Sequence, residues 1–344
     1  MIFRQLFDPV SSTYTYLLAS RRGGEALILD PVLERVDRYL KLIEELDLRL
    51  VKAVDTHLHA DHITGLGALR DHTKCITVMG EQSGVDVVSM RVGDGDHLTI
   101  EGLSLGVIYT PGHTDDSYCF TMADRVFTGD TLLIRGTGRT DFQNGSARAQ
   151  YESIFNRLLK LPEETLVYPA HDYKGDTVST IGEERAHNPR LQVRSVEEYE
   201  DLMANLKLAN PKMMDVAVPA NMRQGLHQEE GEKEGWALSV AQARGMLGRP
   251  EVLLVDLREK SERDRHGCIP GAIHAPYPEL AANIRPGGLL NSLAAAADRR
   301  LVFFCAFGER SAMAVQAALD AGLADAAHIA GGMDAWKKAG APVT

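Results

Sequence analysis

The sequence predicts an α/β protein made of two domains. At 344 residues, the chain is longer than one hydrophobic core ordinarily supports. Short apolar segments alternate with amphipathic ones, which is the pattern of strands separated by helices. An acidic, glycine-punctuated stretch without apolar anchors, residues 227–235, interrupts this pattern and indicates a linker. We therefore expect one domain at residues 1–226 and a second at residues 236–344.

Composition and charge restrict the partners and the location of the protein. Hydrophobic residues make up 44% and charged residues 25% of the chain, as in ordinary soluble proteins. The net charge of −11 disfavours nucleic acid and anionic membrane surfaces as partners. No apolar run approaches membrane-spanning length, and the first residues show neither a signal-peptide core nor a transit pattern. We therefore expect a cytoplasmic protein whose four widely spaced cysteines are reduced: Cys75, Cys119, Cys268 and Cys305.

The first domain is predicted to consist of short strands and amphipathic helices. Apolar runs of strand length occur at residues 2–6, 14–19, 26–29, 50–54, 75–79, 104–109, 118–122 and 125–127. Helical periodicity occurs at residues 36–46, 63–69, 149–161 and 195–208. Several of the strands end directly before polar clusters.

The most informative cluster contains three imidazoles and a carboxylate within six residues: His57, His59, Asp61 and His62. It follows the strand at 50–54, and in an extended loop alternate side chains point the same way. Three further candidate ligands also follow apolar strands: His113, Asp130 and His171. Side chains at the ends of several strands can converge on one rim, and these residue types favour a divalent metal. The spacing does not choose between one metal and two.

These residues resemble the metallo-β-lactamase superfamily, which implies an αββα sandwich with the metal at one edge. Four further segments resemble the narrower persulfide dioxygenase family: residues 134–145, 168–173, 188–191 and 218–223. The resemblance extends over essentially all of residues 1–226. It implies that the first domain oxidises glutathione persulfide with O₂ and water to sulfite and glutathione.

The persulfide dioxygenase resemblance also assigns roles to single residues. It implies one Fe(II) per chain, held by His57, His113 and Asp130, with positions left open for substrate and O₂. The remaining polar residues would orient ligands and water by hydrogen bonds: His59, Asp61, His62 and His171. Three residues would line a glutathione site, where arginine suits the carboxylates of the substrate: Arg139, Tyr173 and Arg190. Members of the family often pair, so a homodimer is a further expectation.

After the linker, strands at 252–256 and 301–304 alternate with helices, which predicts a parallel sheet covered on both faces. Cys305 follows the second strand at once and leads through a glycine-containing loop into a helix at 312–321. Backbone N–H groups and a helix N-terminus lower the pKa of a thiol and stabilise an anion bound on its sulfur. A reactive cysteine is therefore favoured over a structural one.

The second domain resembles the rhodanese sulfurtransferases over residues 236–344. The segments that carry this resemblance are residues 256–259, 266–275, 305–310 and 331–336. It implies that Cys305 carries sulfane sulfur as a persulfide between thiosulfate and glutathione, while Arg310 and the loop amides hold the transferred anion. The two domains would then act on one pathway, with glutathione persulfide as the shared intermediate.

Three other functions fit parts of the sequence. A dinuclear zinc enzyme of the glyoxalase II type would hydrolyse glutathione thioesters without O₂. A pure sulfurtransferase would use the first domain only to bind glutathione. A redox sensor would use Cys305 as a thiol switch and would not need Arg310, but the seven potential metal ligands disfavour it.

Overall fold

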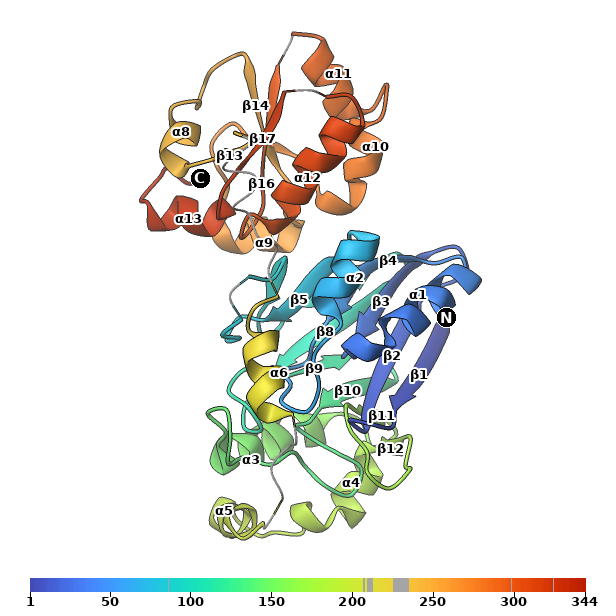
Figure 1. Ribbon diagram of the computed structural model, residues 1–344. Helices are drawn as coiled ribbons and strands as arrows, with labels where there is room; N and C mark the ends of the chain where they lie inside the picture. The colour runs from blue at the N-terminus through green and yellow to red at the C-terminus, as the bar shows by residue number, and fades with distance from the viewer. Residues whose placement is uncertain (86, 207, 209–212, 225–234, 298, 324) are drawn as a thin grey trace. The chain divides into compact units, whose positions relative to one another are not determined.

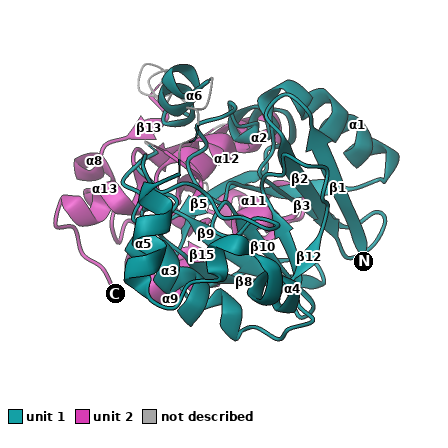
Figure 2. Cartoon of the chain, turned by 90° about the horizontal axis from the view of Figure 1, so that it is seen from below, with its two compact units in different colours: residues 1–86, 91–224 teal, residues 87–90, 225–344 magenta. Residues whose placement is uncertain are grey.

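The computed structural model describes residues 1–344 except 86, 207, 209–212, 225–234, 298 and 324. The chain divides into two compact units, residues 1–86 with 91–224 and residues 87–90 with 225–344 (Figure 2). Residues 227–234 of the predicted linker lie outside the described residues. Among the described helices, none combines the length and apolar character needed to cross a bilayer.

The first unit begins with a six-stranded sheet. Its spatial order is β1 (Ile2–Asp8), β2 (Thr13–Ala19), β3 (Glu25–Leu29), β4 (Arg49–Val54), β5 (Ile76–Gly80) and β6 (Met90–Val92). The strands β3, β4 and β5 run parallel, and β4 is buried at every residue except the first, as expected of a central parallel strand. The helices α1 (Val36–Glu45) and α2 (Leu66–Thr73) lie beside this sheet (Figure 1).

A second six-stranded sheet packs against the first. Its order is β12 (Ser179–Thr180), β11 (Leu166–Pro169), β10 (Arg125–Gly129), β9 (Tyr118–Thr121), β8 (Leu103–Tyr109) and β7 (His97–Ile100). The rings of Tyr16 in β2 and Phe127 in β10 are 5.0 Å apart, which brings the inner faces of the two sheets together. The helical segments that follow are α3 (Ala147–Asn156), η2 (Leu158–Lys160), α4 (Ile181–His187), η3 (Pro189–Leu191) and α5 (Val196–Ala204).

The outer face of the second sheet is covered by α3 and α5. Ile154 of α3 and Tyr199 of α5 share one buried cluster with Val126 and Val167 of the sheet. Figure 1 shows these helices on the side of the second sheet away from α1 and α2. The unit is therefore the predicted αββα sandwich.

The second unit contains a five-stranded sheet in which all pairs are parallel, as the alternating strands and helices predicted. Its order is β13 (Ala237–Leu238), β17 (Ala326–Ile329), β16 (Arg300–Phe304), β14 (Val252–Asp256) and β15 (Ile273–His274). Leu301 and Phe303 of β16 enter one hydrophobic core, while Val302 and Phe304 enter another. Successive side chains of a strand point to opposite faces, so the sheet has a core on each side.

The cores of the second unit are completed by helical segments. They are α8 (Val240–Arg244), α9 (Lys260–His266), η4 (Tyr277–Glu279), α10 (Leu280–Ile284), α11 (Leu289–Ala295), α12 (Glu309–Asp320) and α13 (Gly332–Lys338). The α12 helix begins three residues before the predicted start at 312. Its N-cap is Gly308, whose φ of 93° lies in the left-handed region, so the chain turns into the helix directly after this glycine.

Several helical segments of the first unit differ from the prediction. The α3 helix ends at Asn156 rather than 161, the α5 helix ends at Ala204 rather than 208, and α4 was not predicted. The α2 helix begins at Leu66 rather than 63, and the cluster from His57 to His62 lies in the loop before it. The α6 helix (Met214–Asn221) was not predicted from the sequence. Pro219 lies inside it, and a proline within a short apolar segment argues against a helix when the sequence is read alone.

Candidate metal centre and sulfur-transfer loop

The candidate metal ligands come together at one edge of the two sheets. His57 follows β4 of the first sheet, whereas His113, Asp130 and His171 follow β8, β10 and β11 of the second. The convergence of strand ends that the sequence predicted is therefore present. The structure arranges the seven residues as two adjacent groups.

The first group consists of His57, His113 and Asp130, whose potential ligand atoms lie within 4.8 Å of one another. Thr56 Oγ1 is 2.9 Å from His57 Nδ1, and His113 Nδ1 donates to the backbone oxygen of Arg139 at 2.6 Å. These hydrogen bonds occupy one nitrogen of each ring and leave Nε2 as the ligand atom. His113 Nε2 is 3.6 Å from Asp130 Oδ2. The group fits a metal bound by two histidines and one carboxylate.

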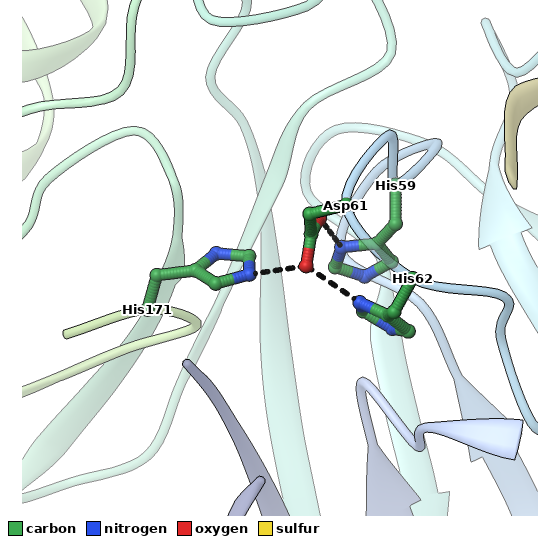
Figure 3. Close-up of side chains that lie close together, drawn as sticks. All are labelled: His59, Asp61, His62 and His171. Carbon is green, nitrogen blue, oxygen red and sulfur yellow. Dashed lines mark hydrogen bonds and ion pairs between the residues drawn. The ribbon is translucent and has the colours of Figure 1, made fainter. Parts of the chain in front are cut away.

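The second group consists of His59, Asp61, His62 and His171 (Figure 3). Asp61 Oδ2 is 2.8 Å from His62 Nδ1 and 2.8 Å from His171 Nε2, so this carboxylate lies between two imidazoles. His59 Nδ1 and His62 Nε2 are buried and have no hydrogen-bond partner among the described residues. Buried polar atoms without partners are rare, and an ion or a water is one established reason for them.

The two groups are joined by His171, whose Nδ1 is 2.7 Å from Asp130 Oδ1. Burial lowers the pKa of His171, but the carboxylates of Asp130 and Asp61 on either side raise it well above its usual range. Burial alone would raise the pKa of Asp130. The opposing effect of the imidazoles, chiefly that of His171, is larger and brings the pKa well below the usual range. Burial and the neighbouring imidazoles hold the pKa of His57 well below its usual range, so this ring is neutral and can bind a metal.

The loop that carries Arg139 passes unusually close to His113. A Cβ atom at Gly138 would lie 2.7 Å from His113 Nδ1 and 2.3 Å from the backbone oxygen of Asp130. Any other residue at 138 would displace the carbonyl of Arg139 from the imidazole. The glycine therefore permits the hydrogen bond that orients His113.

Asp30 supports the metal-binding loop and was not identified from the sequence. It follows β3, and its Oδ1 accepts a hydrogen bond of 2.7 Å from the backbone N–H of Thr56. The same oxygen is 3.1 Å from His59 Nε2, which fixes that ring. Burial lowers the pKa of His59, but Asp30 raises it to about 9. The position of Asp30 directly after an apolar strand was the signal that could have identified this residue from the sequence.

Asn221, at the end of α6, holds the same loop from a distant part of the sequence. Its Nδ2 donates to the backbone oxygens of His59 at 3.0 Å and His62 at 2.9 Å. Its Oδ1 accepts from the backbone N–H of Thr64 at 2.9 Å, across a sequence separation of 157 residues. The side chain is buried, so all three bonds form away from solvent. No local pattern could have linked residue 221 to this loop.

The three residues predicted to bind glutathione are found in different environments. The Arg139 guanidinium forms two hydrogen bonds with Asp141, of 2.6 and 2.7 Å, and lies 3.7 Å above the ring of Phe142. The Tyr173 side chain is exposed, and its ring is parallel to that of His171 at a centroid distance of 6.1 Å.

Arg190 is the predicted glutathione-binding arginine that has no acidic partner among the described residues. Its guanidinium donates to the backbone oxygen and, at 3.1 Å, to the Oγ1 of Thr137. Among the described residues, no carboxylate lies within ion-pair distance of it. Burial lowers the pKa of Arg190, which is the expected effect on a cation without an acidic neighbour.

In the second unit, Cys305 lies beneath the loop that precedes α12. Its side chain is buried, and the backbone N–H of Gly308 donates to its Sγ at 3.1 Å. Arg310 is also buried and forms hydrogen bonds of 2.8 and 2.6 Å with Glu262 of α9, a partner that was not identified from the sequence. Burial lowers the pKa of Arg310, but Glu262 and then Cys305 raise it above its usual range, so Arg310 is a cation close to the sulfur.

Comparisons with known proteins agree with this architecture. Residues 8–171 match the metallo-beta-lactamase superfamily and residues 239–339 match the rhodanese-like domain. Persulfide dioxygenase ETHE1, mitochondrial, from Homo sapiens is 49% identical over 229 residues, which cover 66% of this chain and 89% of the human protein. This chain belongs to the persulfide dioxygenase family. It also carries a C-terminal rhodanese domain, so both family resemblances found in the sequence are confirmed.

Solved structures of related proteins extend the comparison. The crystal structure of ETHE1 from Myxococcus xanthus is 54% identical, covers 64% of this chain and 98% of that chain, and has a TM-score of 0.63. A metallo-beta-lactamase from Staphylococcus aureus covers 96% of this chain and 98% of that chain, with 22% identity and a TM-score of 0.61. The second likeness shows the fold alone. The family membership does not favour the glyoxalase II alternative.

Proposed function

We propose that the protein is a bifunctional enzyme of sulfur metabolism. The first unit oxidises glutathione persulfide with O₂ and water to sulfite and glutathione. The second unit transfers sulfane sulfur between thiosulfate and glutathione through a persulfide on Cys305. The observation that carries the proposal is the group of His57, His113 and Asp130, which offers two imidazoles and one carboxylate. It lies in a chain that is 49% identical over 229 residues to human persulfide dioxygenase ETHE1.

We assign one Fe(II) per chain to this first group. Two imidazoles and one carboxylate leave several coordination positions open, which suits a metal that must meet both a sulfur substrate and O₂. When bound, the iron supplies the redox chemistry between the persulfide sulfur and O₂. The protein contributes the hydrogen bonds that His57 Nδ1 donates to Thr56 Oγ1 and His113 Nδ1 donates to the carbonyl of Arg139, which fix the two rings before the metal arrives.

In the second group, Asp61 is held by His62 and His171 rather than left open. We therefore assign this group to orienting Asp130 and the water and substrate near it. His171 acts on Asp130 directly, because the two side chains are 2.7 Å apart. A fixed carboxylate binds a metal more tightly than one that must first be ordered.

Glutathione persulfide carries carboxylates that require cations. Arg190 has a guanidinium without an acidic partner among the described residues, and we assign it to one of these carboxylates. Arg139 already pairs with Asp141, so a substrate carboxylate would exchange with that residue. The exposed ring of Tyr173 is stacked parallel to that of His171, and we assign it to the glutathione site as well.

Sulfur transfer in the second unit begins when the Cys305 thiolate attacks the outer sulfur of thiosulfate. Sulfite leaves with the electron pair of the broken S–S bond, and a cysteine persulfide remains. A glutathione thiolate then attacks the outer sulfur, and the Cys305 thiolate departs. The N–H of Gly308 and the charge of Arg310 stabilise the anion on sulfur in both steps.

Two variants of the full chain test the division of labour. Asp130→Ala should abolish iron retention and oxygen uptake but leave sulfur transfer from thiosulfate unchanged. Cys305→Ser should abolish thiosulfate-dependent activity but spare the oxidation of added glutathione persulfide. Equal loss of both activities in either variant would show that the assignment of one reaction to each unit is wrong.

The location and the oligomeric state stay predictions. All four cysteines are free in the structure, which agrees with the reducing compartment, the cytoplasm, that we propose. The homodimer expected from the family resemblance is tested by sedimentation equilibrium of the purified chain.

A further inference from the structure

His328 lies next to Ser311, a serine in the first turn of α12, directly after the loop that contains Cys305. The β17 strand carries this fully buried histidine, and its Nδ1 is 3.1 Å from the Oγ of Ser311 in the first turn of α12. The Oγ of Ser311 is in turn 3.6 Å from the Sγ of Cys305. The three side chains therefore form a continuous polar chain. Neither His328 nor Ser311 has a role in the sulfur transfer described above.

The proton on His328 is placed by its surroundings. Burial lowers the pKa of His328 to about 4, against the smaller opposing effect of a backbone hydrogen bond with Ile329, so the ring is neutral at physiological pH and carries a single N–H. His328 Nε2 has no hydrogen-bond partner among the described residues. A buried N–H without an acceptor is rarer than a buried acceptor without a donor. The proton therefore belongs on Nδ1, which donates to Ser311 Oγ.

This donation decides what Ser311 can do with its own hydrogen. A hydroxyl has one hydrogen and two lone pairs. Because Ser311 Oγ accepts from His328, its hydrogen remains available to the backbone oxygen of Gly308, 3.0 Å away, or to the sulfur of Cys305. Hydrogen bonds to an ionised acceptor are the stronger ones, so a thiolate on Cys305 would attract the hydrogen. If His328 accepted instead, that hydrogen would be consumed.

We propose that His328 is a positioning residue that keeps the Ser311 hydroxyl available to the Cys305 thiolate. The inference rests on the proposed sulfur transfer and deepens it. The effect is greatest in the second step, when glutathione takes the outer sulfur and Cys305 departs as a thiolate with the electron pair of the broken S–S bond. A hydroxyl hydrogen pointing at that sulfur stabilises the departing anion without transferring a proton.

Other charged groups near Cys305 act on its thiolate independently of the hydrogen bond between His328 and Ser311. Arg310, paired with Glu262, is a cation that interacts with Cys305, and Glu309 is buried in the same first turn of α12. At the end of β14, Asp256 pairs with the buried Arg258 at 2.7 Å. His328 itself faces the ring of Trp236, at a centroid distance of 5.4 Å. None of these groups is altered by a substitution at 328.

Two substitutions of His328 separate positioning from packing. His328→Leu removes the donor, whereas His328→Asn can place an amide N–H near the position of Nδ1. The ionisation of Cys305 is followed in the full chain by thiolate absorbance at 240 nm, as the difference from the matching Cys305→Ser protein. We expect the Leu variant to raise the pH of half-ionisation by about one unit, as for a lost hydrogen bond to a charged group. The Asn variant should stay close to the wild type.

Three controls complete the test. Ser311→Ala, a smaller change, should reproduce the shift of the Leu variant, and the double variant should show no additional shift. The ionisation of Cys268, measured against Cys268→Ser, should stay constant, since this half-buried thiol does not belong to the group of His328, Ser311 and Cys305. The second-order rate constant for transfer from the Cys305 persulfide to glutathione should fall about tenfold in the Leu variant.

An unchanged thiolate titration in both His328→Leu and Ser311→Ala would overturn the proposal. Equal shifts in the Leu and Asn variants would also overturn it, because they would indicate packing alone. A protein that shows the expected titrations but transfers no sulfur from thiosulfate would leave the positioning role intact and remove the proposed sulfurtransferase function. The two failures are therefore distinguishable.

Discussion

His171 and Asp130 are in direct contact, with His171 Nδ1 2.7 Å from Asp130 Oδ1. Asp130 thus uses one oxygen to bind His171 and has the other, Oδ2, within 3.6 Å of His113 Nε2. This contact connects the two groups of potential ligands. We propose that the first group supplies the metal ligands and that His171, in the second group, orients Asp130.

The first prediction concerns this contact. His171→Ala should weaken iron retention by about 10- to 100-fold, the usual effect of losing a residue that orients a ligand, whereas His57→Ala should abolish it. Iron per chain is measured after dialysis against a graded series of chelator concentrations. Complete loss of iron in both variants would make His171 a ligand, and full retention in His171→Ala would remove its orienting role.

The second prediction concerns Asn221. Asn221→Ala removes three buried hydrogen bonds from the backbone of the metal-binding loop, which should lower the free energy of unfolding by about 1–3 kcal/mol and weaken metal retention. Asn205→Ala is the matched control, because Asn205 lies at the exposed end of α5, where its side chain donates to the backbone oxygen of Asp201 and, within the described part of the chain, to no other group. Chelator-dependent metal loss and denaturant unfolding are compared in both. Equal behaviour of the two variants would contradict the account.

The third prediction concerns the glutathione carboxylates. Arg190→Ala should raise the KM for glutathione persulfide about tenfold or more with little change in kcat, since it removes a charge-assisted bond present throughout the reaction. Arg139→Ala should have a smaller effect on KM, because Asp141 already competes for its guanidinium. Initial rates of oxygen uptake over a range of substrate concentrations supply both constants. An unchanged KM would remove the residue from the substrate site.

The fourth prediction concerns the buried pair of Arg310 and Glu262. Glu262→Gln leaves Arg310 without a carboxylate, so the second unit should lose about 3–5 kcal/mol of stability at pH 7. Burial raises the pKa of Glu262, but Arg310 lowers it below its usual range, so the pair stabilises above the unfolded pKa of about 4.3 and is lost as the pH falls through the lower folded value. The difference in the free energy of unfolding between the wild type and Glu262→Gln should therefore become smaller as the pH falls.

This pair can be followed without interference from the first unit. Both tryptophans of the chain, Trp236 and Trp336, lie in the second unit, so tryptophan fluorescence in urea reports its unfolding alone. A constant difference between wild type and Glu262→Gln from pH 7 to pH 3 would contradict the assignment of the stability change to this carboxylate.

Much of the fold and of the metal site could be predicted from local sequence. The candidate ligands could be predicted because they follow apolar strands, and strand ends of neighbouring sheets meet at one edge. Asn221 and Glu262 were not found, because each reaches its partners through tertiary contacts that leave no trace in local spacing. The sequence predicted a role for the side chain of Arg139, in binding glutathione, but not for its backbone oxygen, which accepts the hydrogen bond that orients His113. The orientation of a carbonyl depends on the path of the loop over Gly138, which composition does not reveal.

The central claim is a mononuclear iron centre that requires O₂. Its most direct test is elemental analysis of the purified chain combined with an oxygen-electrode trace on addition of glutathione persulfide. We predict one iron per chain and consumption of O₂ in step with sulfite release, with no turnover under argon. Two zinc ions per chain and full activity towards a glutathione thioester under argon would contradict the account.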